Sequence, residues 1–103
     1  MGAKAVRFSS QQAYDGNLHR GIAFLNNYQF QDASSIFNNI IIELENRHTP
    51  SLKPILVEAH AQQALVLLKS GQDLMDRQKA YDHLEKALKL DQSHELANEK
   101  MLG

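Results

Sequence analysis

The sequence predicts an all-α protein of one domain, and three observations lead to this. The chain has 103 residues, which is enough for a single compact domain with its own core. It has only two prolines and five glycines, and 43% of its residues are hydrophobic but only 7% aromatic, a composition that suits helices better than a β-sandwich. Its apolar residues recur three and four positions apart, which is the spacing of one face of a helix.

The first two helices are predicted over residues 11–27 and 30–47. No sustained period precedes them, so residues 1–10 are expected to form a tail. The pair Asn26 and Asn27 is a plausible end of the first helix, because asparagine tolerates the left-handed conformation found there. In the second helix, residues 40–42 are apolar around more than one face, so they must meet a second layer of helices or a partner.

A break at residues 48–54 separates this pair from a third helix. Ser51 is its predicted N-cap. Pro54 then falls in the first turn, where its missing N–H does no harm. The third helix is expected to end at Gly71.

Two more helices are predicted beyond this point. A fourth spans about residues 76–90 and carries one apolar stripe. Ser93 is expected to cap a short fifth helix, in which Ala97 and Met101 cover the end of the core.

Two segments share one pattern of small and large residues. Each has a small residue, a large apolar residue three positions later, a turn, and a second small residue that opens the next helix. Two antiparallel helices can cross closely only where side chains are small, and larger side chains fill the space beside the crossing. The residues are Gly21, Phe24, Phe30, Ala33 and Phe37 in the first copy, and Ala64, Leu67, Gly71, Ala80, Leu84 and Ala87 in the second.

This pattern resembles the tetratricopeptide repeat, a pair of antiparallel helices that stacks into arrays. Residues 80–91 match best and look very like the second helix of a typical repeat. Gly21 and Ala64 are 43 residues apart, against a usual spacing of about 34. The positions at which the family often has a large residue are occupied here by Asn17, Arg20, His60 and Gln63.

The resemblance implies two stacked helix pairs closed by a short C-terminal helix, within one domain over residues 11–103. The expected parts are an N-terminal tail at residues 1–10, a first repeat at about 14–47, a linker at 48–54, a second repeat at about 55–92 and a capping helix at 93–102.

Composition excludes several classes of function. The chain has 11 Lys and Arg residues against 12 Asp and Glu, so it lacks the excess positive charge of a dedicated nucleic-acid binder. It has no cysteine, which excludes disulfides, zinc–thiolate sites and thiol catalysis. No apolar run is long enough to span a bilayer, so no membrane insertion is expected, and a cytoplasmic location is predicted.

The sequence contains no catalytic or metal-binding motif. Its histidines are His19, His48, His60, His83 and His94, and no two have the i,i+3 or i,i+4 spacing that zinc ligands on a helix need. No serine stands in a glycine-flanked nucleophile elbow. Glu43 and Glu45 diverge on a helix and are interpreted as solvated charge. We therefore expect no enzyme activity, cofactor or metal.

Recognition of another protein is the remaining hypothesis. In a tetratricopeptide stack the first helix of each pair lines a concave groove, and the resemblance implies that this groove is mainly apolar here. The expected ligand is an apolar segment of a partner, held as an amphipathic helix or extended peptide by an adaptor or chaperone-like module. The implied groove residues are Leu18, Ile22, Leu25, Asn26, Ala61, Gln62, Leu65, Leu68 and Lys69.

Two alternatives stay open. The same residues are core if the tail or the last helix covers them. Two repeats are also fewer than the usual three that make a stable stack. A second hypothesis is therefore a self-assembling unit that forms a homodimer through exposed repeat edges or the surface at residues 40–42.

Overall fold

The fold consists of helices throughout the part of the chain that the structure describes. This computed structural model describes residues 2–47, 50–71 and 73–102, with side chains from residue 12 onward. The predicted all-α class is confirmed. The helices are α1 at Gly2–Asn26, α2 at Phe30–Glu45, α3 at Lys53–Ser70, α4 at Leu74–Leu90 and α5 at Glu95–Leu102, with one 3-10 turn, η1, at Pro50–Leu52.

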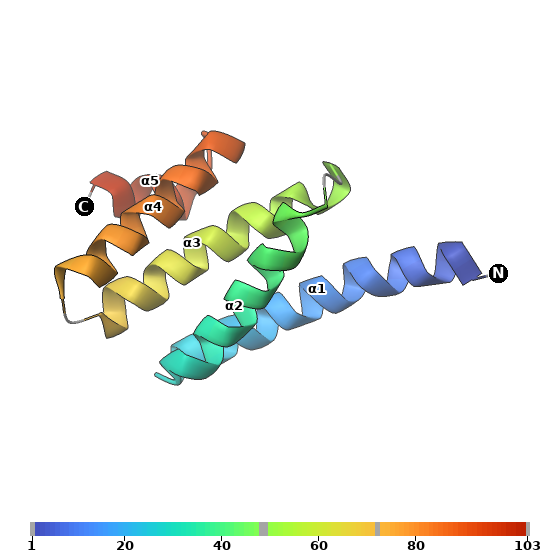
Figure 1. Ribbon diagram of the computed structural model, residues 1–103, viewed down its shortest axis with the longest axis horizontal. Coiled ribbons are helices and arrows are strands. Elements are labelled where there is room, and N and C mark those ends of the chain that lie inside the picture. The colour runs from blue at the N-terminus through green and yellow to red at the C-terminus, as the bar shows by residue number, and fades with distance from the viewer. Residues whose placement is uncertain (1, 48–49, 72, 103) are drawn as a thin grey trace.

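The helices form an elongated stack in which neighbours in sequence are neighbours in space (Figure 1). Helices α1 to α4 alternate in direction, and the stack measures 49 × 28 × 20 Å. Helix α3 lies in the middle, packed against α2 and α4, and it also contacts α1 and α5. None of the described helices is both long and apolar enough to cross a membrane.

Helix α3 belongs to two parts of the core. One face packs with α1 and α2, and the other packs with α4 and α5. The buried residues are Ile55, Ala59 and Val66 on the first face, and Val57, Ala61 and Ala64 on the second. Helix α2 instead buries one stripe, because Ile40 and Ile41 are buried whereas Ile42 is 60% exposed.

The crossing of α1 and α2 depends on Gly21. A Cβ atom at this position would lie 2.6 Å from Cε1 of Phe37, which is much closer than two carbon atoms normally approach. Phe37 itself is fully buried. The small residue of the first repeat copy therefore lies directly against the large one, and the missing side chain makes room for the ring.

Helix α1 begins at Gly2. The predicted tail at residues 1–10 is therefore wrong for residues 2–10, and the helix does not start at Gln11. This segment has no proline, and its one glycine stands at its start, so nothing in it interrupts a helix. Periodicity did not detect the extension because the segment has no apolar stripe.

The predicted N-cap of the third helix is also wrong. Helix α3 follows η1 directly, and Leu52 rather than Ser51 is at the N-cap, where no side chain makes a capping hydrogen bond. The 3-10 turn takes up the residues in which the cap was expected. Pro54 does stand in the first turn of α3, as predicted.

The starts of the last two helices differ from the predictions because other side chains cap them. Asp73 accepts a hydrogen bond from the Asp76 N–H at 2.9 Å, so α4 starts before the predicted residue 76. At α5, Nδ1 of His94 accepts from the Ala97 N–H at 3.2 Å. A histidine thus takes the capping role that was predicted for Ser93.

Helix α1 ends in a tight turn at Tyr28, which has a φ of 63°. The Gln29 N–H donates to the Phe24 carbonyl at 2.9 Å, and the Tyr28 N–H donates to the Leu25 carbonyl at 3.1 Å. These are the two hydrogen bonds of a Schellman motif. The predicted end of the helix is correct in place, but tyrosine rather than Asn27 takes the left-handed conformation.

Gly21→Ala is expected to lower the free energy of unfolding by about 1–3 kcal/mol, because the new methyl group must displace the Phe37 ring. Gly16→Ala is the matched control in the same helix. A Cβ atom there meets nothing within 4 Å, so this change is expected to raise stability by up to about 1 kcal/mol. Urea denaturation followed by circular dichroism measures both. A Gly21→Ala protein as stable as the wild type would contradict the close crossing.

Candidate functional site

A groove of about 640 Å³ lies between the C-terminal ends of α2 and α4, and η1 and the N-terminal half of α3 complete it. Its volume is in the range of sites that hold small molecules. The lining residues are Leu44, Glu45 and Arg47 at the end of α2, Pro50 and Leu52 in η1, Lys53, Leu56 and His60 in α3, and Lys86, Lys89 and Leu90 in α4.

The floor of this groove is apolar. Leu44 and Leu52 are buried, whereas Leu56 and Leu90 are half-buried. Leu52 stands about one turn before Leu56, a rise of roughly 6 Å, and His60 continues this line by one further turn with a buried polar side chain. A molecule that fills the groove would remove the remaining contact of the half-buried leucines with water.

The rim of the groove is basic. Its cations are Arg47, Lys53, Lys86 and Lys89, and Glu45 is the one carboxylate among the lining residues. Within the described ranges, none of these four cations lies within 4.0 Å of a carboxylate oxygen. This basic rim therefore concentrates positive charge on a chain whose formal net charge is -1.

The groove also contacts a buried histidine, His60, which is 1% exposed. Its Nε2 lies 3.2 Å from Oε2 of Glu45 on α2, and its Nδ1 lies 2.9 Å from Nδ1 of His83 on α4. An ionised carboxylate can only accept a hydrogen bond, so the hydrogen of neutral His60 is on Nε2, and Nδ1 accepts from His83. One side chain of α3 thus joins α2 to α4.

Burial keeps this histidine pair neutral. Loss of hydration, followed by repulsion from His83, lowers the pKa of His60 from 6.5 to about 4, although Glu45 acts in the opposite direction. Burial, and then the positive charge of Lys86, also lower the pKa of His83. A second proton on His60 would place N–H groups of the two rings against each other unless His83 changed its tautomer.

A second buried polar contact joins α3 to α2. Gln63 is buried and donates from Nε2 to the Ser34 hydroxyl at 3.0 Å, and Asn38 donates to the same hydroxyl at 3.3 Å. Among the described atoms, Oε1 of Gln63 is buried without a hydrogen-bond partner. Because an unpaired buried acceptor costs about 1–3 kcal/mol, Gln63 stabilises this contact less than a well-packed leucine would.

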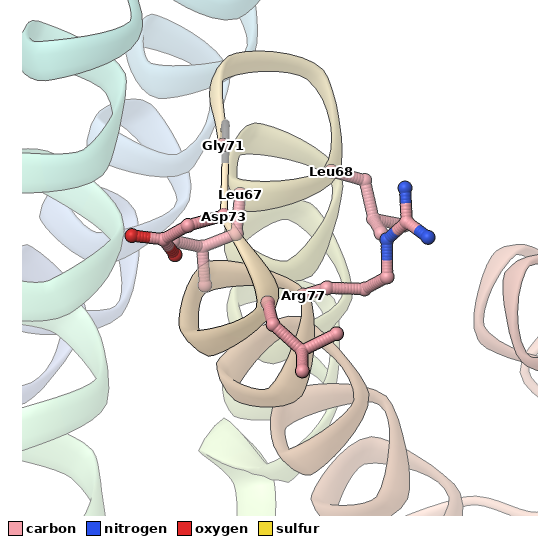
Figure 2. Close-up of a pocket in the computed structure, with 6 residues that line it drawn as sticks. Leu67, Leu68, Gly71, Asp73 and Arg77 are labelled. Carbon is pink, nitrogen blue, oxygen red and sulfur yellow. The ribbon is translucent and has the colours of Figure 1, made fainter.

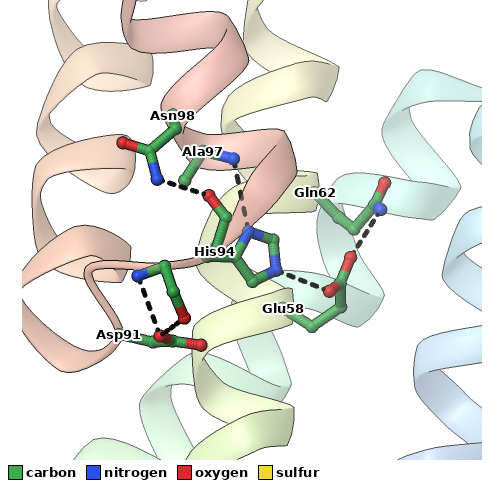
Figure 3. Close-up of polar contacts among 7 residues, drawn as sticks. Glu58, Gln62, Asp91, His94, Ala97 and Asn98 are labelled. Atoms are coloured by element: carbon green, nitrogen blue, oxygen red, sulfur yellow. Dashed lines mark hydrogen bonds and ion pairs between the residues drawn. The ribbon is translucent and has the colours of Figure 1, made fainter.

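A third polar cluster holds α5 against α3 (Figure 3). His94 Nε2 lies 2.8 Å from Oε1 of Glu58, and Gln62 donates to the other oxygen of Glu58 at 2.8 Å. Since Nδ1 of His94 accepts from the Ala97 backbone, Nε2 carries the hydrogen and donates to Glu58. The ring therefore caps α5 and anchors it to α3 at the same time.

A smaller cavity of about 220 Å³ lies at the turn between α3 and α4 (Figure 2). Gly71 is required in this turn, because a Cβ atom would collide with the Leu67 carbonyl oxygen and lie 2.7 Å from Cβ of Asp76. Asp73, which lines the cavity, already caps α4. The cavity is smaller than most ligand sites, so we assign it to the packing of the turn.

The structure divides the residues that were predicted to line a concave groove. Leu18, Leu25 and Ala61 are at most 7% exposed and belong to the core, so the prediction that they contact a partner is wrong. They pack between helices, from which a partner is excluded. Of the others, Ile22, Gln62, Leu65 and Leu68 are half-buried, and Asn26 and Lys69 are exposed.

Sequence reasoning missed the contact between His60 and His83. The two residues are 23 positions apart and meet only because α3 packs on α4, so a search for ligand spacings within one helix does not find them. One signal was present, since His60 and Gln63 align with positions at which the tetratricopeptide pattern often has large core residues, and both are buried. His48 lies outside the described residues.

The groove offers apolar contact and positive charge. The described residues of its lining include no serine, threonine or cysteine. The described side chains also contain no group of three or more His, Asp and Glu residues that could hold a metal ion. Comparisons of the chain with models of protein families, with curated proteins and with solved structures find no match.

We expect the protein to lose stability as the pH falls from 6.5 to 4. The pKa of His60 is lower in the folded than in the unfolded chain, so the unfolded chain takes up the proton first. Above pH 6.5 His60 is neutral in both states and costs the folded protein nothing. Between pH 6.5 and the folded pKa of about 4, the free energy of unfolding is expected to fall by roughly 3 kcal/mol. Urea denaturation at a series of pH values across this interval measures the loss.

His60→Phe is the control for this prediction, because phenylalanine is aromatic, fills a similar volume and does not titrate. Apart from the partners of His60, which are Glu45 and His83, the titrating groups have the same surroundings in both proteins, so their contribution to the pH dependence is the same. The stability of this variant is expected to depend less on pH, by roughly 3 kcal/mol over the same interval. Equal pH dependence in both proteins would contradict a buried neutral His60.

Proposed function

We propose that this protein is a non-catalytic interaction module that binds an apolar segment of a partner protein in the groove between α2 and α4. The observation that carries the proposal is the apolar floor, where Leu56 and Leu90 are half-buried above Leu44 and Leu52. No other part of the described chain fills this groove. An adaptor or chaperone-like role would follow from such binding.

The apolar floor is large enough to hold the anchors of a short peptide. Each leucine of a partner that is buried there contributes about 1.5–3 kcal/mol before the cost of ordering. Leu52 and Leu56 are about one helical turn apart, so two anchors one turn apart on a partner helix match their spacing. Binding of this kind is expected to be weak, with a Kd of about 1 μM or higher.

This site differs from the concave groove that the tetratricopeptide resemblance implies. That groove would lie along α1 and α3, where Leu18, Leu25 and Ala61 are not accessible. The proposed site lies instead where the C-terminal ends of α2 and α4 meet η1 and the N-terminal half of α3. The repeat architecture itself stays a proposal, and the contact of Gly21 with Phe37 supports it for the first pair.

Self-assembly through exposed repeat surfaces stays a prediction. The large exposed apolar side chains stand on separate elements, at the α1–α2 turn, on α2, at the start of α4 and at the end of α5. They are Tyr28, Ile42, Leu74, Met75 and Leu102. Because no one face is built from them, we favour the groove as the binding surface.

The proposal is tested with random peptides displayed on phage and selected against the wild-type protein. We expect the selected peptides to bind Leu56→Gln about 10- to 100-fold more weakly, as the loss of one apolar contact implies. Leu65→Gln is the matched control, because Leu65 is on the same helix, is also half-buried and packs against the same core cluster. Its affinity for the peptides is expected to change less than about threefold.

Circular dichroism and urea denaturation establish that both variants are folded before binding is compared. Failure to select any peptide would contradict the proposed function. An equal loss of binding in both variants would contradict a specific groove. A loss confined to Leu65→Gln would place the site on the concave face instead.

A further inference from the structure

Contacts within the chain do not account for the basic rim. Its four cations lack an ion-pair partner among the described residues. Carboxylates do lie near them, because Glu45 lines the groove, the charge of Lys53 acts on Asp91, and Asp82 and Glu85 precede Lys86 and Lys89 by one helical turn. Glu45 Oε2 faces His60, and Asp91 Oδ1 accepts hydrogen bonds from the Ser93 N–H and hydroxyl.

Helix dipoles explain only half of the rim. Lys89 is in the last turn of α4, and Arg47 follows the end of α2, where a positive charge is favourable. Lys53, however, is the first residue of α3, where the exposed N–H groups make a positive charge unfavourable. Lys86 stands near the histidine pair and opposes its protonation. Lys53 acts favourably on the charge of Asp91, and Asp82 precedes Lys86 by one turn of α4, but neither lysine forms a direct ion pair in the described chain.

We propose that the groove selects partner segments in which apolar anchors are flanked by Asp or Glu, an inference that rests on the proposed function. The anchors would cover Leu56 and Leu90, and the flanking carboxylates would meet Lys53 on one side and Lys86 on the other. Rim charges of this kind act mainly on specificity and on the rate of association.

A protein segment suits this groove better than other polyanions do. A nucleic acid presents phosphates at its surface and would leave the apolar floor uncovered. The net charge of -1 also gives the whole chain no general attraction for polyanions. A membrane surface is flat on this scale, whereas the floor lies between two helices.

Three synthetic helical peptides test the inference. They share two leucines at i and i+4, and they differ only in their flanking residues, which are glutamate, glutamine or lysine. Fluorescence anisotropy at low salt is expected to show binding about tenfold tighter for the glutamate peptide than for the glutamine peptide, with the lysine peptide weakest. The difference should shrink at high salt, because ions screen exposed charges over about 10 Å or less.

Lys86→Gln is expected to weaken binding of the glutamate peptide about threefold and to leave binding of the glutamine peptide unchanged. Lys69→Gln is the matched control, because it removes the same charge from an exposed residue. Lys69 is in the last turn of α3, whereas the groove contacts the N-terminal half of that helix. This control is expected to change neither affinity.

Several results would overturn the inference. Equal binding of the glutamate and glutamine peptides would do so while leaving the proposed function intact, whereas failure of all three to bind would overturn both. Equal effects of Lys86→Gln and Lys69→Gln would indicate general charge attraction. Competition by anionic lipid vesicles or by an oligonucleotide would assign the rim to another class of ligand. Self-association that Lys86→Gln abolishes, measured by sedimentation velocity, would assign the groove to a second copy of the chain.

Discussion

The burial of α3 on two opposite faces is the constraint on which the rest of this structure depends. Its apolar residues must serve two parts of the core, one with α1 and α2 and one with α4 and α5. Its polar residues His60 and Gln63 must then find hydrogen bonds inside the protein, on the helices that cover them. The groove follows from the same arrangement, because α2 and α4 flank the N-terminal half of α3 and leave an opening between their ends.

His60 links the interior of the protein to this groove. Its Nε2 lies beside one oxygen of Glu45, the acidic group among the described lining residues, and none of the four rim cations forms an ion pair with that carboxylate within 4.0 Å. Lys86 affects both the buried histidine pair and the surface of the groove. It disfavours protonation of the histidine pair, and it belongs to the rim that a ligand would meet. The packing of the core and the charge of the surface are therefore not independent here.

Much of the fold could be predicted because local signals determine it. The apolar period located the helices, and the pattern of small and large residues included both Gly21 and Phe37, which the structure brings into contact. Residues 2–10 were missed because a helix without an apolar stripe leaves no period. Leu18 was placed in a groove because periodicity marks an apolar face without saying what covers it. The contact of His60 with His83, and with it the groove, arises from helices that meet only after packing, which no spacing within one helix reveals.

Mapping of amide chemical shifts tests the central claim most directly. The claim is that an apolar, acid-flanked segment binds between α2 and α4, and the measurement adds the glutamate-flanked peptide to ¹⁵N-labelled protein. We expect the largest shifts at Leu56, Lys86 and Leu90, which line the groove, and little change at Ile22 and Leu65 on the predicted concave face. The largest shifts at Ile22 and Leu65 would contradict the claim.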